Sequence, residues 1–197
     1  ADRMPAFLNS LTSSELDSLR QMNEQMGSML SHHDGPQHIR LRALVSKAFT
    51  PRVVERVHQR VEELVNGMID AVAPTGRMDL IADLAFPLPA IVISEMIGIP
   101  PEDRVRVKRW ADDYAEFQTA SHALADRALV AQSSLAELRG YVEGIVEERR
   151  ADPRDDLITG LVAAEEQGDR LSAEELVNLV VLILIAGNET TTNLITN

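Results

Sequence analysis

The strongest constraint on the fold of this chain is an apolar run near its end that continues without a break into polar residues. The run at 179–185 reads Leu-Val-Val-Leu-Ile-Leu-Ile, and residues 186–192 read Ala-Gly-Asn-Glu-Thr-Thr-Thr. A helix that is apolar on every side has to be enclosed by protein, so the run predicts a buried helix. Glycine, threonine and asparagine are weak helix formers. We therefore expect the polar continuation to enter the interior for a reason other than packing.

The rest of the chain also shows helical spacing, interrupted where proline and glycine cluster. Apolar residues at spacings of three and four over 53–72 predict an amphipathic helix that starts at Thr50-Pro51 and ends at Pro74-Thr75-Gly76. Asp34-Gly35-Pro36 starts the helix before it. Further helices are expected at 101–119, 123–151 and 155–166, with a short helical turn and a buried helix within 79–98, and a capping box at Ser172-Ala173-Glu174-Glu175 opens the last one. No segment alternates with period two, so the fold class is mainly α.

Composition excludes several functions. The 197 residues carry a net charge of −12, which argues against a nucleic-acid-binding surface, and 45% are apolar, which suffices for a packed core. Cysteine is absent, so the chain supplies no disulfide, zinc-thiolate site or cysteine nucleophile. We find no apolar stretch of membrane-spanning length and no signal peptide, and expect a cytoplasmic protein. Because the first residue is Ala and the chain stops without a clear helix end, we interpret it as an interior piece of a longer protein.

The polar turn of the last helix has the residues of a ligand site. Thr190 can bond the carbonyl of Ala186, which would loosen the helix where Gly187 has no side chain. A flat ligand would then lie against Ala186 and Gly187, with Leu182 and Ile185 as an apolar wall and Glu189 as a proton source. The alternative is that Thr190 only bonds its own helix and Glu189 points to water.

A second candidate site lies at 34–51, Asp-Gly-Pro-Gln-His-Ile-Arg-Leu-Arg-Ala-Leu-Val-Ser-Lys-Ala-Phe-Thr-Pro. His38 and Arg42 are four residues apart on one helix face, so both donors can reach carboxylates at one edge of a ligand. An ordinary cationic helix surface is the alternative interpretation.

Both segments resemble the cytochromes P450, the haem-thiolate monooxygenases. Ala186-Gly187-Asn188-Glu189-Thr190-Thr191 is similar to their central-helix signature, and the segment around His38 and Arg42 is similar to the one that grips the haem propionates in soluble bacterial members. The resemblance implies the cytochrome P450 fold, ending within the long oxygen-binding helix. It also implies one partial domain over 1–197, without the N-terminal segment and the C-terminal half that carries the cysteine ligand.

The family implies the chemistry as well. The cofactor would be haem b (heme b, iron protoporphyrin IX), held by His38, Arg42, Ala186, Gly187 and Thr190. Thr190 would donate to dioxygen while Glu189 and ordered water bring protons. The full-length protein would hydroxylate or epoxidise an apolar small molecule, whereas this chain alone, which lacks the iron-ligating cysteine, would be inactive.

The resemblance also indicates which segments meet substrate and redox partner. Substrate would contact Phe117, the start of the next helix near Leu124, and Leu182, Ile185 and Ala186. A ferredoxin, served by its reductase, would dock on a basic island in an acidic chain. The island comprises Arg40, Arg42, Lys47, Arg52, Arg56 and Arg60, with Glu55 as the one acid between 38 and 60.

Two other functions compete with a monooxygenase. A helical ligand-binding or interaction module that has lost its haem ligand is favoured by the absence of cysteine and opposed by the presence of both Glu189 and Thr190. A plain interaction domain requires both motifs to be accidental. His32, His33 and His38 lack a convincing helical ligand spacing, so we assign them no metal.

Overall fold

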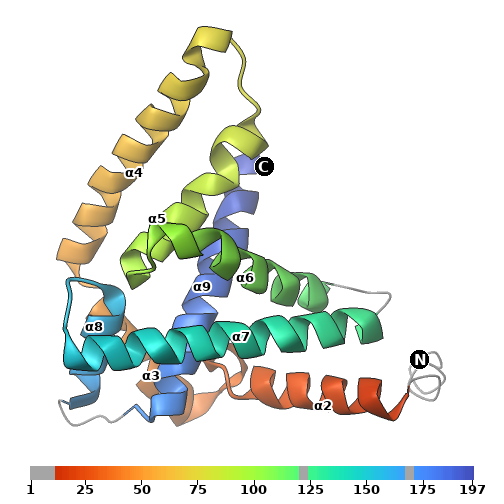
Figure 1. Ribbon diagram of the computed structural model, residues 1–197. Helices are drawn as coiled ribbons and strands as arrows, with labels where there is room; N and C mark the ends of the chain where they lie inside the picture. Colours follow the sequence, from red (N-terminus) through yellow and green to blue (C-terminus); the bar gives the residue numbers. More distant parts are fainter. Residues whose placement is uncertain (1–11, 120–123, 167–170) are drawn as a thin grey trace.

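The computed structural model describes residues 12–119, 124–166 and 171–197, and the described residues contain helices and no strand (Figure 1). The α-helices are α2 (Ser13–Gly27), α3 (Gly35–Ala48), α4 (Pro51–Val72), α5 (Pro87–Ile97), α6 (Arg104–Thr119), α7 (Leu124–Ala151), α8 (Leu157–Glu166) and α9 (Ala173–Thr196). Single helical turns lie at Leu30–His32, Ala73–Thr75, Leu80–Ala85 and Pro101–Asp103. The predicted fold class is confirmed.

The helix boundaries follow the local signals in the sequence. The Thr50 hydroxyl accepts a hydrogen bond from the Val53 amide at 3.3 Å at the start of α4, and Ser172 and Glu175 form both bonds of the capping box of α9. Pro36 occupies the first turn of α3. Gly76 and Gly98, with φ of 63° and 91°, adopt the left-handed conformation that stops α4's last turn and α5.

The core forms around α9, which crosses behind α7 (Figure 1). Its residues 176–185 are buried or half-buried, as the apolar run predicted, because α5, α6, α7 and α8 all contact α9. Met22 and Met29 are fully buried, and the Tyr114 hydroxyl of α6 donates to the Met29 sulfur at 3.6 Å. The largest buried apolar side chains are Tyr114, Met22, Met29, Leu41, Leu44, Ile97, Leu135, Leu138, Ile158, Leu161 and Leu171.

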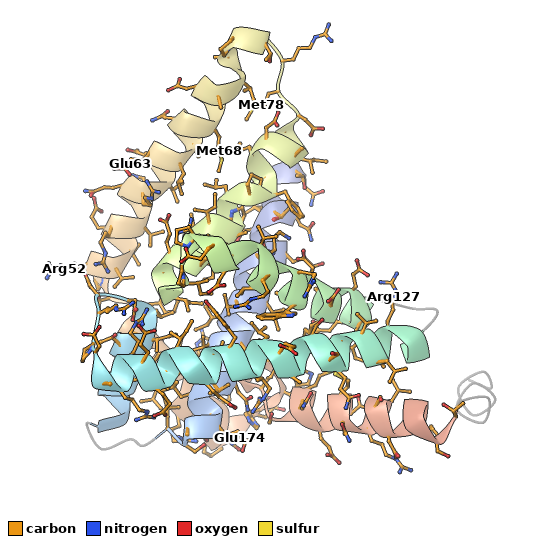
Figure 2. The ribbon with its side chains drawn as sticks, in the orientation of Figure 1. Arg52, Glu63, Met68, Met78, Arg127 and Glu174 are labelled. Atoms are coloured by element: carbon orange, nitrogen blue, oxygen red, sulfur yellow. The ribbon has the colours of Figure 1, made fainter. Side chains whose placement is uncertain are left out.

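The apolar face of α4 is the part of the fold that the sequence predicted least well. The helix is amphipathic as expected, but none of its residues is buried, and Val54 is 56% exposed. In Figure 1, α4 leans away from α5 and α9 at its far end, and in Figure 2 Met68 lies on the side that faces α5. A pattern of spacing identifies an apolar face without identifying the partner that covers it.

Two described segments are long and apolar enough to cross a membrane, contrary to the expectation from the sequence. They are Leu80–Ile97 and Ala173–Thr196, with mean hydropathies of 1.8 and 1.4 over their windows. The second contains α9, the central helix of the core. Length and composition alone do not separate such a helix from a membrane span, since a buried core helix passes the same test.

Candidate functional site

The polar turn of α9 exposes one strip of its surface. Ala186, Glu189 and Thr190 are exposed and lie three and four residues apart, so they share one side of the helix. The Thr190 hydroxyl donates to the Ala186 carbonyl at 2.6 Å, which confirms the predicted bond. Thr192 makes the same bond to the Asn188 carbonyl at 3.0 Å. The bond by itself is therefore not special to Thr190, and Thr191 is exposed as well. Thr190 is distinguished by combining this bond with a position on the same side of α9 as Ala186 and Glu189.

The other side of the same turn is packed against the core. A Cβ added to Gly187 would lie 3.1 Å from Ile93 on α5, so the missing side chain lets the two helices approach closely. Ile185 is buried in the core cluster, and Leu182 is half-buried against it. We predicted from the sequence that Gly187 lines a ligand groove; in the structure the side of Gly187 that lacks a side chain faces Ile93 of α5 instead. α9 runs as a regular α-helix from Ala173 to Thr196 through this turn.

The predicted carboxylate donors lie on α3. His38 is half-buried and Arg42 is exposed, and within the described part of the chain neither side chain has a recorded ion pair. Arg40 between them forms an ion pair with Glu175 in the first turn of α9. Thr190 follows Glu175 by 15 residues, or about 22 Å at the helical rise of 1.5 Å per residue. A ligand that touches both motifs has to extend along α9.

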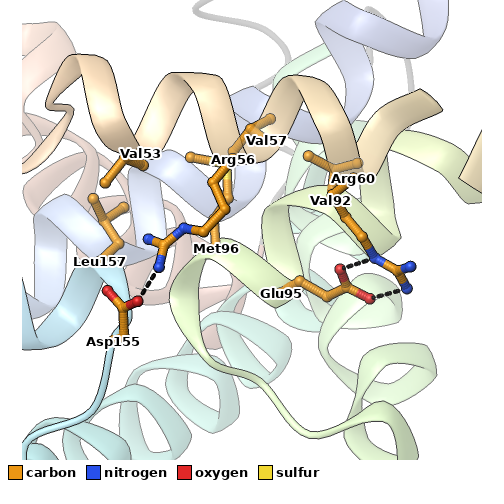
Figure 3. A pocket seen from close by; sticks show the side chains of 9 residues that line it. All are labelled: Val53, Arg56, Val57, Arg60, Val92, Glu95, Met96, Asp155 and Leu157. Atoms are coloured by element: carbon orange, nitrogen blue, oxygen red, sulfur yellow. Dashed lines mark hydrogen bonds and ion pairs between the residues drawn. The ribbon is translucent and has the colours of Figure 1, made fainter. Parts of the chain in front are cut away.

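Ion pairs from distant parts of the chain neutralise half of the basic island. Arg40 pairs with Glu175 and Arg56 with Asp155, while Arg60 bonds Glu95 at 2.8 Å (Figure 3). The hydrogen bond from Arg60 lowers the pKa of Glu95, against the opposing effect of burial. The remaining members of the basic island, for which the described residues show no ion pair, are Arg42, Lys47 and Arg52. The island is therefore smaller than the sequence predicted.

Two of these ion pairs, Arg56–Asp155 and Arg60–Glu95, border a groove between α4, α5 and α8. Its volume is about 280 Å³, and its apolar walls come from Val53, Val57, Val92, Met96 and Leu157. Figure 3 shows the two ion pairs at its edge. No residue of α9 lines this groove, so it is separate from the strip that carries Glu189 and Thr190.

The predicted substrate contacts are divided between core and surface. Phe117, at the end of α6, is buried in the core cluster, whereas Ala186 is exposed. The side chain of Leu124 is outside the described residues. Within the described ranges, His, Cys, Asp and Glu form no group of three that would hold a metal ion.

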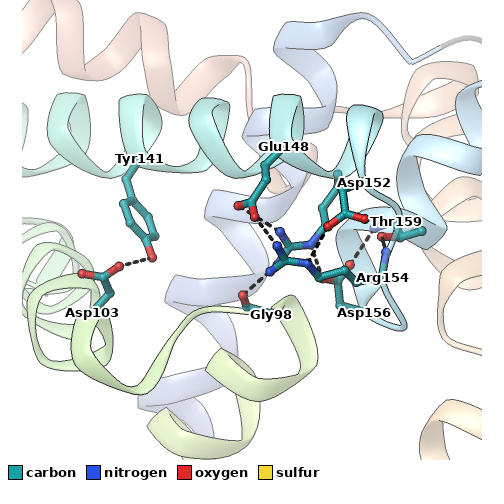
Figure 4. Close-up of polar contacts among 9 residues, drawn as sticks. Gly98, Asp103, Tyr141, Glu148, Asp152, Arg154, Asp156 and Thr159 are labelled. Carbon is teal, nitrogen blue, oxygen red and sulfur yellow. Dashed lines mark hydrogen bonds and ion pairs between the residues drawn. The ribbon is translucent and has the colours of Figure 1, made fainter.

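Two polar networks were missed by the sequence interpretation. Asn188, next to Gly187, is buried and donates to Asp112 on α6 at 3.3 Å. Arg149, at the end of α7, donates to Asp156 at 2.5 Å and to the Gly98 carbonyl at 3.1 Å, and Figure 4 shows this cluster with its neighbours. Asn188 already stood out as a polar residue continuing a buried run, but no local pattern identifies partners so distant in the chain.

We compared the sequence and the structure with those of known proteins. No family model matches the chain. A cytochrome P450 of Bacillus subtilis is 40% identical over 180 residues, which are 91% of this chain and 43% of the relative. The structure of myxobacterial CYP267B1 with myristic acid superposes with a TM-score of 0.75 at 40% identity, over 93% of this chain and 45% of the other. P450BioI, bound to an acyl carrier protein carrying hexadec-9Z-enoic acid, gives a TM-score of 0.79 at 33% identity, over 89% and 44% of the two chains.

The chain thus spans somewhat under half the length of these relatives. Within that span the likeness holds at the level of sequence and of fold. The chain belongs to the cytochrome P450 family.

Proposed function

We propose that the protein carrying this chain is a haem-dependent monooxygenase that uses dioxygen and externally supplied electrons to hydroxylate or epoxidise an apolar small molecule. One observation carries the proposal. Glu189 and Thr190 share an exposed strip of α9, while the opposite side of the same turn is fixed against α5 by the close approach of Gly187 and Ile93. An acid and an alcohol are thus presented side by side from a rigid element.

The residues present fit a haem. Ala186 is small and exposed on this strip, so a flat group can approach the helix there. His38 and Arg42 offer cationic or hydrogen-bonding groups suited to carboxylates, and Gly187 contributes by keeping the turn close to α5. When bound, haem b supplies the redox chemistry that activates dioxygen. None of the 197 residues is a cysteine, so the thiolate that tunes such a haem has to come from outside this sequence.

Thr190 and Glu189 have separate roles in this proposal. The Thr190 hydroxyl is held by the Ala186 carbonyl, which orients its oxygen on the exposed strip. Glu189 is exposed beside it and can exchange protons with water, so it acts as the entry point for protons that Thr190 directs.

We further propose that these residues are one part of a larger haem domain. The uncovered apolar face of α4 supports this, since its Val54 and Ile69 are exposed, and so does the greater length of the relatives. On its own, the segment would be inactive because it has no thiolate.

The substrate class we propose is an apolar small molecule. Fatty acyl chains are present in the CYP267B1 and P450BioI structures, which supports an apolar pocket in this protein too. Leu182 and Ala186 would contact it from α9. Phe117 and Ile185 lie in the core, so they would support the wall of the pocket and meet substrate only at its edge.

For electron supply we propose an acidic ferredoxin with its reductase, in a cytoplasmic setting. Its docking surface would be formed by Lys47 and Arg52, the members of the basic island that form no ion pair with the described residues and are not assigned to the haem carboxylates. Attraction between such surfaces raises the encounter rate and weakens with salt.

The test of this function is Thr190→Ala in the haem-loaded protein. We expect haem binding to persist while electrons are diverted from product to peroxide, because the proton path is broken and the fold is not. Measuring product and peroxide per dioxygen consumed separates these fates. Unchanged product formation in the variant would refute the role of Thr190, and a parent protein that binds no haem would leave the ligand-binding module as the better description.

A further inference from the structure

Asn188 is a buried polar residue in the middle of the α9 turn. Its side chain is 6% exposed, although it follows a run of apolar core residues and precedes the exposed Glu189. Successive helical residues are about 100° apart around the axis, so Asn188 and Thr190 point to different sides of α9. The turn therefore has an exposed strip and an anchored side.

The anchor is a chain of polar contacts to α6. Asn188 Nδ2 donates to Asp112 Oδ1 at 3.3 Å, and Lys108 Nζ donates to the other carboxylate oxygen at 2.6 Å. The Lys108 ammonium also lies 3.6 Å from the centre of the Phe86 ring, just before α5. Asn188 is thereby joined to a charged pair that is itself held in place on two sides.

The amide oxygen of Asn188 lies in the same packed region. It is buried and accepts no hydrogen bond from the described residues. Asn188 lines a cavity of about 10 Å³ together with Ser94 of α5 and Lys108 of α6, and apolar side chains form the rest of its wall. Three helices therefore meet at this one amide group.

Packing does not explain an asparagine here. Its neighbours in α9, Leu184 and Ile185, are apolar and buried, and a buried amide oxygen that accepts no hydrogen bond destabilises the fold. A residue such as leucine would avoid that cost. A hydrogen bond is directional, so it favours one rotation of α9 about its axis over slightly different rotations, which an apolar contact would tolerate.

We propose that Asn188 is a positioning residue: through Asp112 it fixes the rotation of the α9 turn relative to α6, and so the direction in which Glu189 and Thr190 are presented. The inference rests on the proposed function of those two residues. It adds that α6, whose last turn contains the predicted substrate contact Phe117, is connected through Asp112 to the turn of α9 that carries Glu189 and Thr190.

The test compares three variants. Asn188→Ala removes the anchor, and because alanine is the best helix former, local helix propensity cannot account for any loosening. The exchange of donor and acceptor, Asn188→Asp with Asp112→Asn, restores a hydrogen bond between the same positions beside Lys108. Asn178→Ala is the matched control, since Asn178 is buried in the same helix and bonded to Ser28 and Arg139, ten residues from Asn188.

Two quantities are measured. The first is hydrogen exchange of the backbone amides at 187–192, which needs no haem. The second is product formed per dioxygen consumed in the haem-loaded protein. We expect Asn188→Ala to increase hydrogen exchange at 187–192 and to lower the product ratio severalfold. The double variant Asn188→Asp/Asp112→Asn should restore both quantities. Asn178→Ala should leave both quantities near the parent values.

The inference is overturned if Asn188→Ala matches the parent in both measurements, or if the donor–acceptor exchange restores neither. Should Asn188→Ala fail to fold, the double variant Asn188→Asp/Asp112→Asn decides alone. If it folds with the hydrogen-exchange rates and the product ratio of the parent, it supports the anchor; if either value is altered, it contradicts the anchor. Failure of the proposed function would appear elsewhere, as a parent protein with no turnover or a Thr190→Ala variant with an unchanged product ratio.

Discussion

Replacing Gly98 by alanine should destabilise the fold more than the same change at any other glycine in a turn of the described residues. Gly98 ends α5 with φ of 91°. A Cβ there would lie 2.9 Å from Arg149 Nη2 and closer still to the Asp156 carboxylate. Arg149 is 2% exposed, and the pair it forms with Asp156 connects α5, α7 and the start of α8.

The magnitude has two parts. A non-glycine residue in the left-handed region costs about 1–2 kcal/mol. The Cβ would also displace Asp156 from Arg149, and a hydrogen bond between charged groups contributes about 1.5–3 kcal/mol. Burial opposes the charged form of Arg149, but the hydrogen bonds and charges of Asp156 and Glu148 outweigh this effect and raise the pKa of Arg149, so its guanidinium stays charged at neutral pH. We expect a loss of about 3–5 kcal/mol in the free energy of unfolding.

Alanine substitutions at two other glycines measure the backbone cost without the contact to the Arg149–Asp156 pair. Gly76→Ala has φ of 63° but no atom within 4 Å of the added Cβ, so it should show the backbone cost alone. Gly144→Ala, in the middle of α7 and also without a neighbour within 4 Å, should be neutral or stabilise by about 0.5–1 kcal/mol. Urea unfolding followed by the fluorescence of the single, buried Trp110 measures all three. Equal losses for Gly98→Ala and Gly76→Ala would refute the proposed contact with the Arg149–Asp156 pair.

Three further predictions concern charge and capping. Arg60→Gln should reduce stability by less than about 1 kcal/mol at pH 7, since the pair with Glu95 is partly exposed. Because the pKa of Glu95 in the folded protein lies below its ordinary value of 4.5, this contribution is present above pH 4.5 and disappears as the pH falls through the folded pKa. The unfolding curves of parent and variant should therefore converge in acid. A difference that persists in acid would contradict that assignment. Ser172→Ala should cost about 1 kcal/mol through loss of the α9 cap, measured by urea unfolding against Ser133→Ala, an exposed serine within α7. Arg52→Gln should slow reduction by an acidic ferredoxin at low salt and have little effect at high salt, and a salt-independent rate would argue against docking there.

Local rules accounted for most of the fold. Thr50, Gly76 and Ser172 act on backbone groups within a few residues, so their effect on helix ends could be predicted without the tertiary structure. The enclosure of α9 followed in the same way, because a helix apolar on all sides has few alternatives. The exposure of Glu189 and Thr190 was not predicted, because the sequence analysis expected the polar continuation of the apolar run to enter the interior, whereas both residues are exposed.

Long-range pairing was outside the reach of the sequence. The basic island looked larger than it is because Glu175 and Asp155, which neutralise Arg40 and Arg56, are more than 90 residues away in the chain. Gly187 suggested space for a ligand, whereas the nearest group to its open face is Ile93 of α5. In both cases the residue type indicated the kind of contact to expect, but the tertiary packing determines which residue makes that contact.

The most direct test of the account is the carbon monoxide difference spectrum of the reduced, haem-loaded protein that carries this sequence. The account predicts the Soret band typical of a cysteine-ligated haem, with the thiolate supplied by a cysteine outside these residues, as none of the 197 is cysteine. A protein that takes up no haem, or that binds haem without this band, would contradict the proposal that Glu189 and Thr190 serve a haem-thiolate monooxygenase.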